Sequence, residues 1–315
     1  MFVDDAKVKQ IVTNEEDVES LQSELEKLEK WSKENNMVFN QKKFQVMRYG
    51  PNEELKNNTQ YFAGNYEEVI ERFTSLRDLG IQLSEDGTFS EHIENVCKKA
   101  RQKCGWLMRT FFNRKCHFMK QMFNSLVQPH LDYCSQLWMP LEGKHMEMVE
   151  KVMRDYTRWI PELRGLSYHE RLSKLMMNSQ QRRMERYQVL YCWKVMEGLV
   201  PNPGLTCSPG DTRRGRLCEV PQLLGTPTVR KLRKQSFQMA GPLLWNSLPK
   251  NIRNMTKCSQ EDFKELLDQF LTAVPDEPRA SGCVPGACDP YTGRATNTLI
   301  HQAARRRPAW RDLTT

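Results

Sequence analysis

Two adjacent acids near the start of the chain, Asp4 and Asp5, interrupt a stretch that is otherwise rich in hydrophobic, strand-forming residues. Aspartate is depleted in strands because it competes for backbone hydrogen bonds, so the pair is typical of a tight turn between two strands. A hairpin that displays two carboxylates could instead hold Mg²⁺, a hard cation that binds oxygen ligands. From these residues alone both interpretations stay open.

A second stretch with binding chemistry lies between Asn95 and Leu131, where the sequence has no acidic residue. Its basic residues are Lys98, Lys99, Arg101, Lys103, Arg109, Arg114, Lys115 and Lys120. A soluble helix usually carries charges of both signs, so this run favours contact with an anionic partner over an ordinary solvated face. A shorter cluster of Arg230, Lys231, Arg233 and Lys234 is equally compatible with a nuclear-localisation or RNA-binding patch and with an ordinary basic surface.

The net charge of +8 is unevenly distributed along the 315 residues. Residues 1–95 contain 11 Lys and Arg against 20 Asp and Glu, whereas residues 96–315 contain 36 against 19. The first part is therefore acidic and the second strongly basic, which favours nucleic acid as the partner of the second part.

The composition also bears on the compartment. No apolar run approaches the roughly 20 residues that a membrane-spanning helix needs, so neither a transmembrane segment nor a membrane partner is predicted. The N-terminus carries acids where a signal peptide would need basic and then apolar residues. Ten cysteines are scattered without the spacing of a disulfide framework. We therefore expect an intracellular protein, nuclear or cytoplasmic, with reduced thiols.

The elements that position these residues change in type near Ser90. Before it, Asn14 can cap a helix that extends to about Asn36 and packs an apolar seam against a sheet. Strand-like segments follow at 44–49, 60–62, 68–73 and 76–83.

After Ser90 the apolar spacing becomes helical, with one apolar face on 93–111 and the basic residues opposite. Further helices are predicted at 118–127, 130–138, 144–160, 167 onward, 179–196 and 261–271. The predicted fold class is α+β: β-hairpins with one packing helix, then a mostly α-helical bundle and a disordered tail. The predicted parts are 1–88, 89–200, a basic region at 201–274, and the tail at 275–315.

Several segments, taken in order, point to a known family. They are F-V-D-D at 2–5, LEKLEKWSKENNMVFNQKKFQVM at 25–47, SLRDLGIQLSEDGTFSEHI at 75–93, SLVQPHLDYCSQLW at 125–138, IPELRGLSYHERL at 160–172 and WNSLP at 245–249. In this order and spacing they resemble the reverse transcriptases of non-LTR (LINE-type) retrotransposons of the jockey and chicken-repeat groups. Within them, Asn40 and Lys43 match an N-x-x-K motif, and Leu79 and Gly80 lie in the segment similar to the primer-grip hairpin.

The resemblance implies a partial reverse-transcriptase palm in 1–88 and a thumb-like bundle in 89–200. It implies that Asp4 is a catalytic metal ligand and Asp5 its partner carboxylate, with Mg²⁺ as the cofactor and dNTP as the one small-molecule substrate. It also implies that the basic residues contact an RNA template and DNA primer, or an RNA–DNA duplex.

The same comparison predicts an incomplete metal site. Phosphoryl transfer with two Mg²⁺ ions needs carboxylates that bridge both ions, and the family supplies one from an earlier palm strand. The 315 residues contain no counterpart of that strand or of the fingers, so we expect this chain alone to extend no primer. The predicted function is a truncated RNA-directed DNA polymerase; the alternative is a non-catalytic, nucleic-acid-binding remnant of a mobile element.

Overall fold

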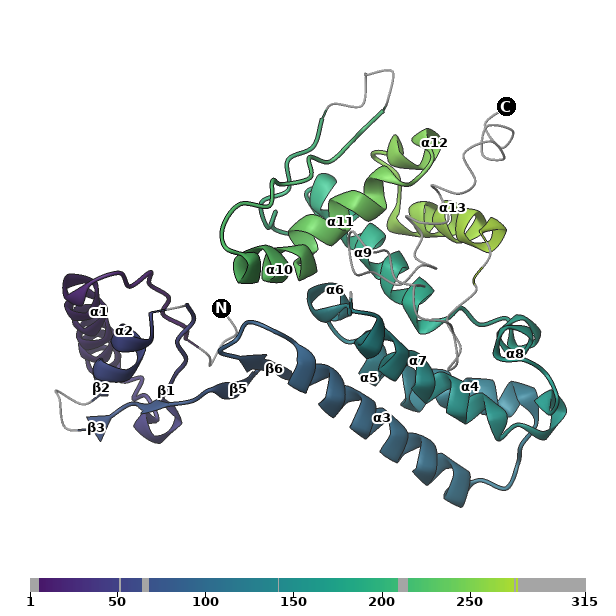
Figure 1. Ribbon diagram of the computed structural model, residues 1–315, viewed down its shortest axis with the longest axis horizontal. Helices are drawn as coiled ribbons and strands as arrows, with labels where there is room; N and C mark the ends of the chain where they lie inside the picture. Colours follow the sequence, from purple (N-terminus) through teal and green to yellow (C-terminus); the bar gives the residue numbers. More distant parts are fainter. Residues whose placement is uncertain are drawn as a thin grey trace. The chain divides into compact units, whose positions relative to one another are not determined.

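The computed structural model describes most of the chain (Figure 1), namely residues 6–50, 52–63, 68–140, 142–208, 215–274 and 276. Contacts divide the chain into two compact units, Met1–Glu91 and His92–Thr315. Most described residues are helical, and the first unit carries three two-stranded sheets. The coarse prediction of small sheets followed by a helical part is confirmed. None of the helices in these stretches has the length and apolar character that a membrane crossing requires.

The first unit combines two α-helices with short strands. Its elements are α1 (Glu15–Glu34), a 3₁₀ turn (Gln41–Lys43), β1 (Gln45–Val46), α2 (Glu53–Asn58), β2 (Phe62–Ala63), β3 (Glu68–Val69), β4 (Glu71–Arg72), β5 (Ser75–Asp78) and β6 (Ile81–Ser84).

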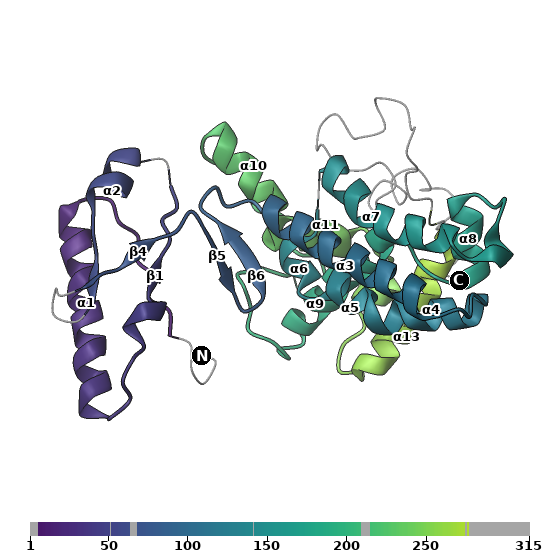
Figure 2. The same ribbon diagram turned by 90° about the horizontal axis from the view of Figure 1, so that it is seen from below.

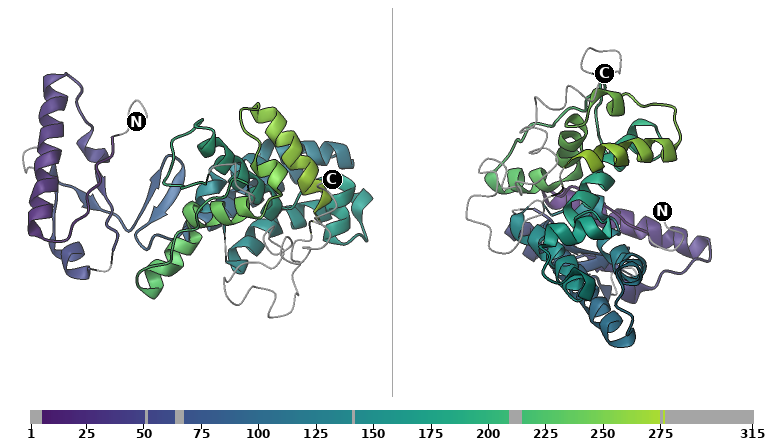
Figure 3. Two further views of the ribbon diagram at one scale, coloured as in Figure 1. Left: turned by 90° about the horizontal axis from the view of Figure 1, so that it is seen from above. Right: turned by 90° about the vertical axis from the view of Figure 1, so that its right-hand side faces the viewer.

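Helix α1 begins where the sequence predicted. The Asn14 side chain accepts a hydrogen bond from the Asp17 amide at 2.9 Å, and the Asp17 carboxylate accepts one from the Asn14 amide at 3.3 Å, which completes a capping box. The helix lies along the small sheets (Figures 2 and 3), and a polar contact attaches it. The buried Gln22 amide exchanges two hydrogen bonds, at 2.9 and 3.1 Å, with the backbone of Phe62 in β2.

The single strand predicted at 68–73 is wrong, because this segment forms two short strands, β3 and β4. Strand β3 pairs antiparallel with β2, whereas β4 pairs in parallel with β1, so this segment serves two sheets. Strands β5 and β6 form a hairpin whose two loop residues, Leu79 and Gly80, have φ of 45° and 87°. Two consecutive positive φ values are typical of the type I′ turn that matches the twist of a two-residue hairpin.

The second unit is helical. Its elements are α3 (Ser90–Thr110), α4 (Cys116–Leu126), α5 (Gln128–Asp132), α6 (Ser135–Trp138), α7 (Gly143–Arg158), a 3₁₀ turn (Pro161–Leu163), α8 (Tyr168–Leu175), α9 (Gln180–Met196), α10 (Pro227–Gln235), α11 (Phe237–Asn246), α12 (Lys250–Arg253) and α13 (Gln260–Ala273). The single helix predicted at 130–138 is wrong: Cys134 adopts a left-handed conformation with φ of 49°, which separates α5 from α6.

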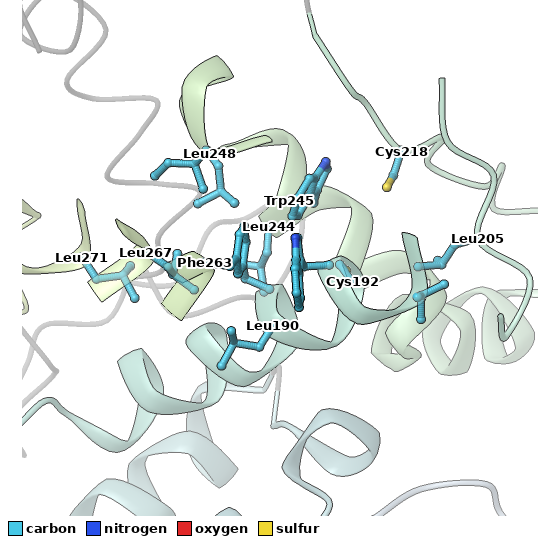
Figure 4. Close-up of a cluster of buried hydrophobic side chains, with 14 of the residues drawn as sticks. Leu190, Cys192, Leu205, Cys218, Leu244, Trp245, Leu248, Phe263, Leu267 and Leu271 are labelled. Carbon is cyan, nitrogen blue, oxygen red and sulfur yellow. The ribbon is translucent and has the colours of Figure 1, made fainter. Parts of the chain in front are cut away.

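A hydrophobic core joins α9, α11 and α13. The Phe263 ring stacks on Trp193 with ring centroids 4.8 Å apart, and it lies 6.2 Å from the Trp245 ring. Figure 4 shows Phe263 and Trp245 among the leucines of this cluster. The core includes Leu190, which precedes residue 200 in the sequence, and Leu244, which follows it. The domain boundary predicted at residue 200 therefore falls inside one hydrophobic core.

A buried polar cluster connects α7 and α8 to the N-terminus of α9. The Glu150 carboxylate accepts hydrogen bonds from the Tyr168 hydroxyl and from the backbone amides of Gln180 and Gln181, both at 3.3 Å. Ser179 caps α9, and its backbone amide and hydroxyl both donate to the Asp276 carboxylate. Apart from Asp276, the predicted tail at 275–315 lies outside the described residues.

Candidate nucleic-acid interface

Helix α3 is long, and its sequence separates two faces. Its buried residues recur at helical spacing, and they are His92, Ile93, Cys97, Ala100 and Leu107. The helix lies beside the other helices of the second unit, and the Arg101 guanidinium donates to the Met148 carbonyl of α7 at 3.5 Å (Figures 1 and 2). Because these five residues are buried, the apolar face lies against the bundle, as the sequence predicted, and Arg101 lies at the edge of that contact.

The opposite side of α3 carries the predicted basic residues. We define the α3 basic face by its five exposed cations: Lys98, Lys99, Arg101, Lys103 and Arg109. None of the ion pairs found within the described residues involves any of the five. The acids of this helix, Glu91 and Glu94, lie near its N-terminus, where negative charge complements the helix dipole. The other charged residues of the helix are all basic.

An exposed aromatic residue, Trp106, lies within this basic face, and the sequence reasoning missed it. Trp106 is 43% exposed, and the Lys103 ammonium lies 5.8 Å from the centre of its ring. The ring also makes an edge contact with Phe111 at 5.9 Å, which fixes one side of the indole. The spacing of Trp106 could have identified it from the sequence. Position 106 follows Lys99 by seven residues and Lys103 by three, which places the indole on the charged face of the helix rather than on the apolar one. Beyond the helix end, Phe112 is 94% exposed.

Three other predicted basic residues are engaged within the fold. The Arg114 guanidinium donates to the Met108 carbonyl, and the Lys120 ammonium donates to the Met176 carbonyl at 3.2 Å. Lys115 is exposed but close to Glu162. The pKa of Glu162 is lowered first by its hydrogen bonds with Cys116 and then by the charges of Lys174 and Lys115. These three are therefore less available to a partner than the α3 basic face.

The second predicted cluster forms the helix α10, which the sequence reasoning did not assign. Thr226 caps it and Pro227 begins it, as is common for a first helical residue. Two of its cations form hydrogen bonds with carbonyl groups of the preceding loop. Arg230 donates to the Gly225 carbonyl at 2.9 Å, and Arg233 donates to the Leu224 carbonyl at 3.2 Å. Lys231 forms an ion pair with Glu142 at 3.1 Å. Arg230, Lys231 and Arg233 are exposed and Lys234 is partly buried, so this cluster combines exposed charge with local contacts.

The remaining predicted site residues lie in the first unit. Asn40 and Lys43 are exposed on either end of the 3₁₀ turn, where the Lys43 amide donates to the Asn40 carbonyl at 2.9 Å. Leu79 and Gly80 form the β5–β6 turn. Asp4 and Asp5, predicted to hold Mg²⁺, lie outside the described residues. Within the described stretches, no group of three or more His, Cys, Asp or Glu side chains is placed to hold a metal ion.

The α3 basic face offers two kinds of contact to a nucleic acid. Lysine and arginine side chains neutralise phosphates without reading the sequence, because every nucleotide carries the same phosphate. An exposed indole can stack on an unpaired base, and this contact is also tolerant of sequence. The combination favours binding that is strong at low salt and indifferent to base identity.

Comparison with known proteins adds little to this geometry. The sequence matches no family model, and no solved structure matches it. An uncharacterized protein of Caenorhabditis elegans is 26% identical over 121 residues. The match covers 38% of this chain and 59% of that relative.

Proposed function

We propose that this protein binds nucleic acid through the α3 basic face, as the thumb-containing part of a LINE-type reverse transcriptase. The observation that carries the proposal is the exposed, acid-free basic surface around Trp106. Charge of a single sign over most of a 21-residue helix costs self-repulsion, and that cost is offset when phosphates lie against it. The ordered family-like segments in residues 1–271 support the assignment to reverse transcriptases.

The partner in this proposal is an RNA template with its DNA primer, or the RNA–DNA duplex they form. Contacts to the duplex backbone would position the nucleic acid, and Trp106 would stack on an unpaired base beside the duplex. By the family resemblance, Asp4 and Asp5 would supply part of a Mg²⁺ site, which activates the primer hydroxyl and stabilises the leaving pyrophosphate.

Binding is tested by its salt dependence. With about 4–6 phosphate contacts, the slope of log affinity against log salt should be about −4 to −5 on duplex DNA. Replacing Lys98, Lys99, Arg101 and Lys103 by Gln keeps helix propensity while removing four charges. That variant should bind far more weakly, with a shallower slope, and equally so on unrelated sequences.

A matched variant separates location from net charge. Lys9, Lys27, Lys30 and Lys33 are also exposed, and the last three are paired with acids on α1. Replacing these four by Gln lowers the net charge equally but should leave affinity and slope close to those of wild type. Equal losses of affinity in both quadruple variants would show that the net charge of the protein, and not the position of the cations on α3, accounts for the effect.

A further variant tests whether Trp106 stacks on an unpaired base. Trp106→Ala should weaken binding to single-stranded RNA by about 1–3 kcal/mol, with a smaller effect on duplex. Trp159, which is 64% exposed on the C-terminal cap of α7, provides the control, because Trp159→Ala should change neither.

Catalysis is a separate question from binding. Template-directed incorporation of dNTP that disappears in an Asp4→Ala variant would support polymerase activity in this chain. Binding without incorporation, which we expect from two adjacent carboxylates alone, would favour the non-catalytic alternative.

A further inference from the structure

Two thiols face each other in the second unit, at positions that the proposed nucleic-acid binding does not use. Cys207 and Cys218 pair across an isolated antiparallel β-bridge, and their sulfur atoms are 2.8 Å apart. Both are free thiols in this structure.

The backbone register around the pair suits a covalent bond. The Ser208 amide donates to the Leu217 carbonyl at 2.7 Å, and the Glu219 amide donates to the Thr206 carbonyl at 2.8 Å. These hydrogen bonds flank the cysteines, which makes them a non-hydrogen-bonded pair. In such pairs the Cα atoms are about 4.5 Å apart, within the range that a disulfide spans.

The two thiols differ in reactivity. Cys207 is partly exposed, whereas Cys218 is buried. The hydrogen bond from Cys218 lowers the pKa of Cys207 against the effect of its burial, and the Arg216 charge lowers it further. The same hydrogen bond and burial raise the pKa of Cys218. Cys207 is therefore the thiol that ionises first and meets an oxidant from solvent.

We propose that Cys207 and Cys218 form a redox-sensitive pair that hydrogen peroxide oxidises to an intrachain disulfide. The Cys207 thiolate attacks one peroxide oxygen, the O–O bond breaks, and the products are a sulfenic acid and hydroxide. The Cys218 sulfur then attacks the Cys207 sulfur, the S–O bond breaks, and its oxygen leaves as water with the Cys218 proton. With hydrogen peroxide, the proton that Cys207 released converts the hydroxide to a second water. Two electrons pass from the thiols to the peroxide.

The disulfide would link the segment at Cys207 to the segment at Cys218, which already hydrogen-bonds to the helical core. The Cys218 amide donates to the Asn246 side chain at 2.9 Å, and the Asn246 amide donates to the Cys218 carbonyl at 2.8 Å. The carbonyl of the neighbouring Arg216 accepts from Trp245 and Arg253. Oxidation would therefore tether the segment at Cys207 to α11 through Cys218, raising the melting temperature by about 5 °C.

The sequence provides a sharp readout of the pairing. Tryptic peptides 195–213 and 217–230 contain one cysteine each, Cys207 and Cys218, because arginines at 213, 214 and 216 separate them. Cys192, which also lies close to this pair, falls in peptide 187–194. The full-length protein is treated with graded hydrogen peroxide, alkylated and digested, and the peptides are identified by mass spectrometry.

We expect peptides 195–213 and 217–230 to become linked, with an intact monomer mass lower by two hydrogens and full reversal by dithiothreitol. The linked pair should persist in Cys258→Ser, a control at a partly exposed thiol, and be absent from Cys207→Ser. A link to peptide 187–194, a link between two chains, or overoxidation of Cys207 without any link would overturn the proposal. Because the pairing is measured in the wild-type protein, a variant that fails to fold leaves the test intact.

Discussion

At the scale of single residues, Glu150 is a buried ionisable group whose pKa departs strongly from its ordinary value. Its side chain is buried, and burial raises its pKa to about 7, although hydrogen bonds from Tyr168 and from the amides of Gln180 and Gln181 favour the charged form. The nearby Asp276 charge raises the pKa further. Glu150 therefore holds its proton in the folded chain at pH values where an unfolded chain has released it.

This difference predicts a pH-dependent stability. The contribution of Glu150 is complete below its ordinary pKa of 4.5 and is lost as the pH rises to about 7, because the folded state then binds more protons than the unfolded state. Glu150→Gln is uncharged at every pH. Between pH 4.5 and 7.5 the unfolding free energy of this variant should gain about 3 kcal/mol relative to wild type.

Urea unfolding at a series of pH values measures that gain. The control is Glu94→Gln on the exposed side of α3, whose stability should follow the wild type across the same range. Parallel curves for Glu150→Gln and wild type would show that Glu150 is ionised in the folded protein.

Sequence reasoning also works at the residue scale only where a local rule decides the structure. The caps at Asn14 and Ser167 were predictable because the cap and its partner are three residues apart and need no tertiary contact. Trp106 was not singled out, because an indole on a charged face looks the same in sequence whether it is exposed or covered. Asp4 and Asp5 rest on the family resemblance and stay a prediction.

At the scale of elements, two glycines inside helices have opposite surroundings. Around Gly241 in α11, an added Cβ would lie 2.8 Å from the Cys192 sulfur of α9 and 2.8 Å from the Phe237 ring. Around Gly105 in α3, an added Cβ would meet the flexible Arg109 guanidinium at 3.3 Å and no other atom within 4 Å. Gly241 thus allows α9 and α11 to approach closely, whereas Gly105 has no such role.

Alanine at these two positions should therefore act in opposite directions. Helix propensity favours alanine by up to about 1 kcal/mol at both. At Gly241 the steric conflict should outweigh this gain and destabilise the protein by about 1–3 kcal/mol, whereas Gly105→Ala should stabilise it by up to about 1 kcal/mol. Thermal unfolding monitored by circular dichroism compares the two variants with wild type, and a stabilising Gly241→Ala would refute the close approach.

Among elements, long amphipathic helices were the most predictable and the small sheets the least. Helices α3, α7 and α9 were located from their apolar spacing to within a few residues. The strands of the first unit are two residues long in four cases, too short for alternation to identify, and their pairing depends on distant segments. The break at Cys134 and the helix α10 were missed because the first depends on a single backbone angle and the second has no buried residue.

At the scale of the whole molecule, the distribution of charge follows the division of the fold. The acidic excess ends near Asn95, and the compact units divide at Glu91. An acidic unit repels phosphate, so the proposed contacts fall on the second unit, where the basic face of α3 begins within two turns of the division. The change in charge along the sequence thus coincides with the division between the two units.

The two units also differ in how much of each is buried. Among the described residues, the buried hydrophobic side chains of the first unit are Tyr61, Ala63 and Ile81, whereas the second unit contains 38. Stability at each amide depends on the apolar area that its local opening exposes. Residues 6–86 should therefore exchange backbone hydrogen faster than the bundle at 90–198.

Two helices provide a matched comparison within the same chain. Helix α1 has 20 residues and a capping box, and helix α9 has 17 residues and a capping serine, yet only α9 is largely buried. If helical hydrogen bonding alone set protection, their central amides would exchange alike. We expect those of α1 to exchange at least about 100-fold faster, a difference of roughly 2.7 kcal/mol in opening free energy. Mass spectrometry of deuterium uptake in full-length protein measures this, and equal protection of α1 and α9 would show that the two units open as one.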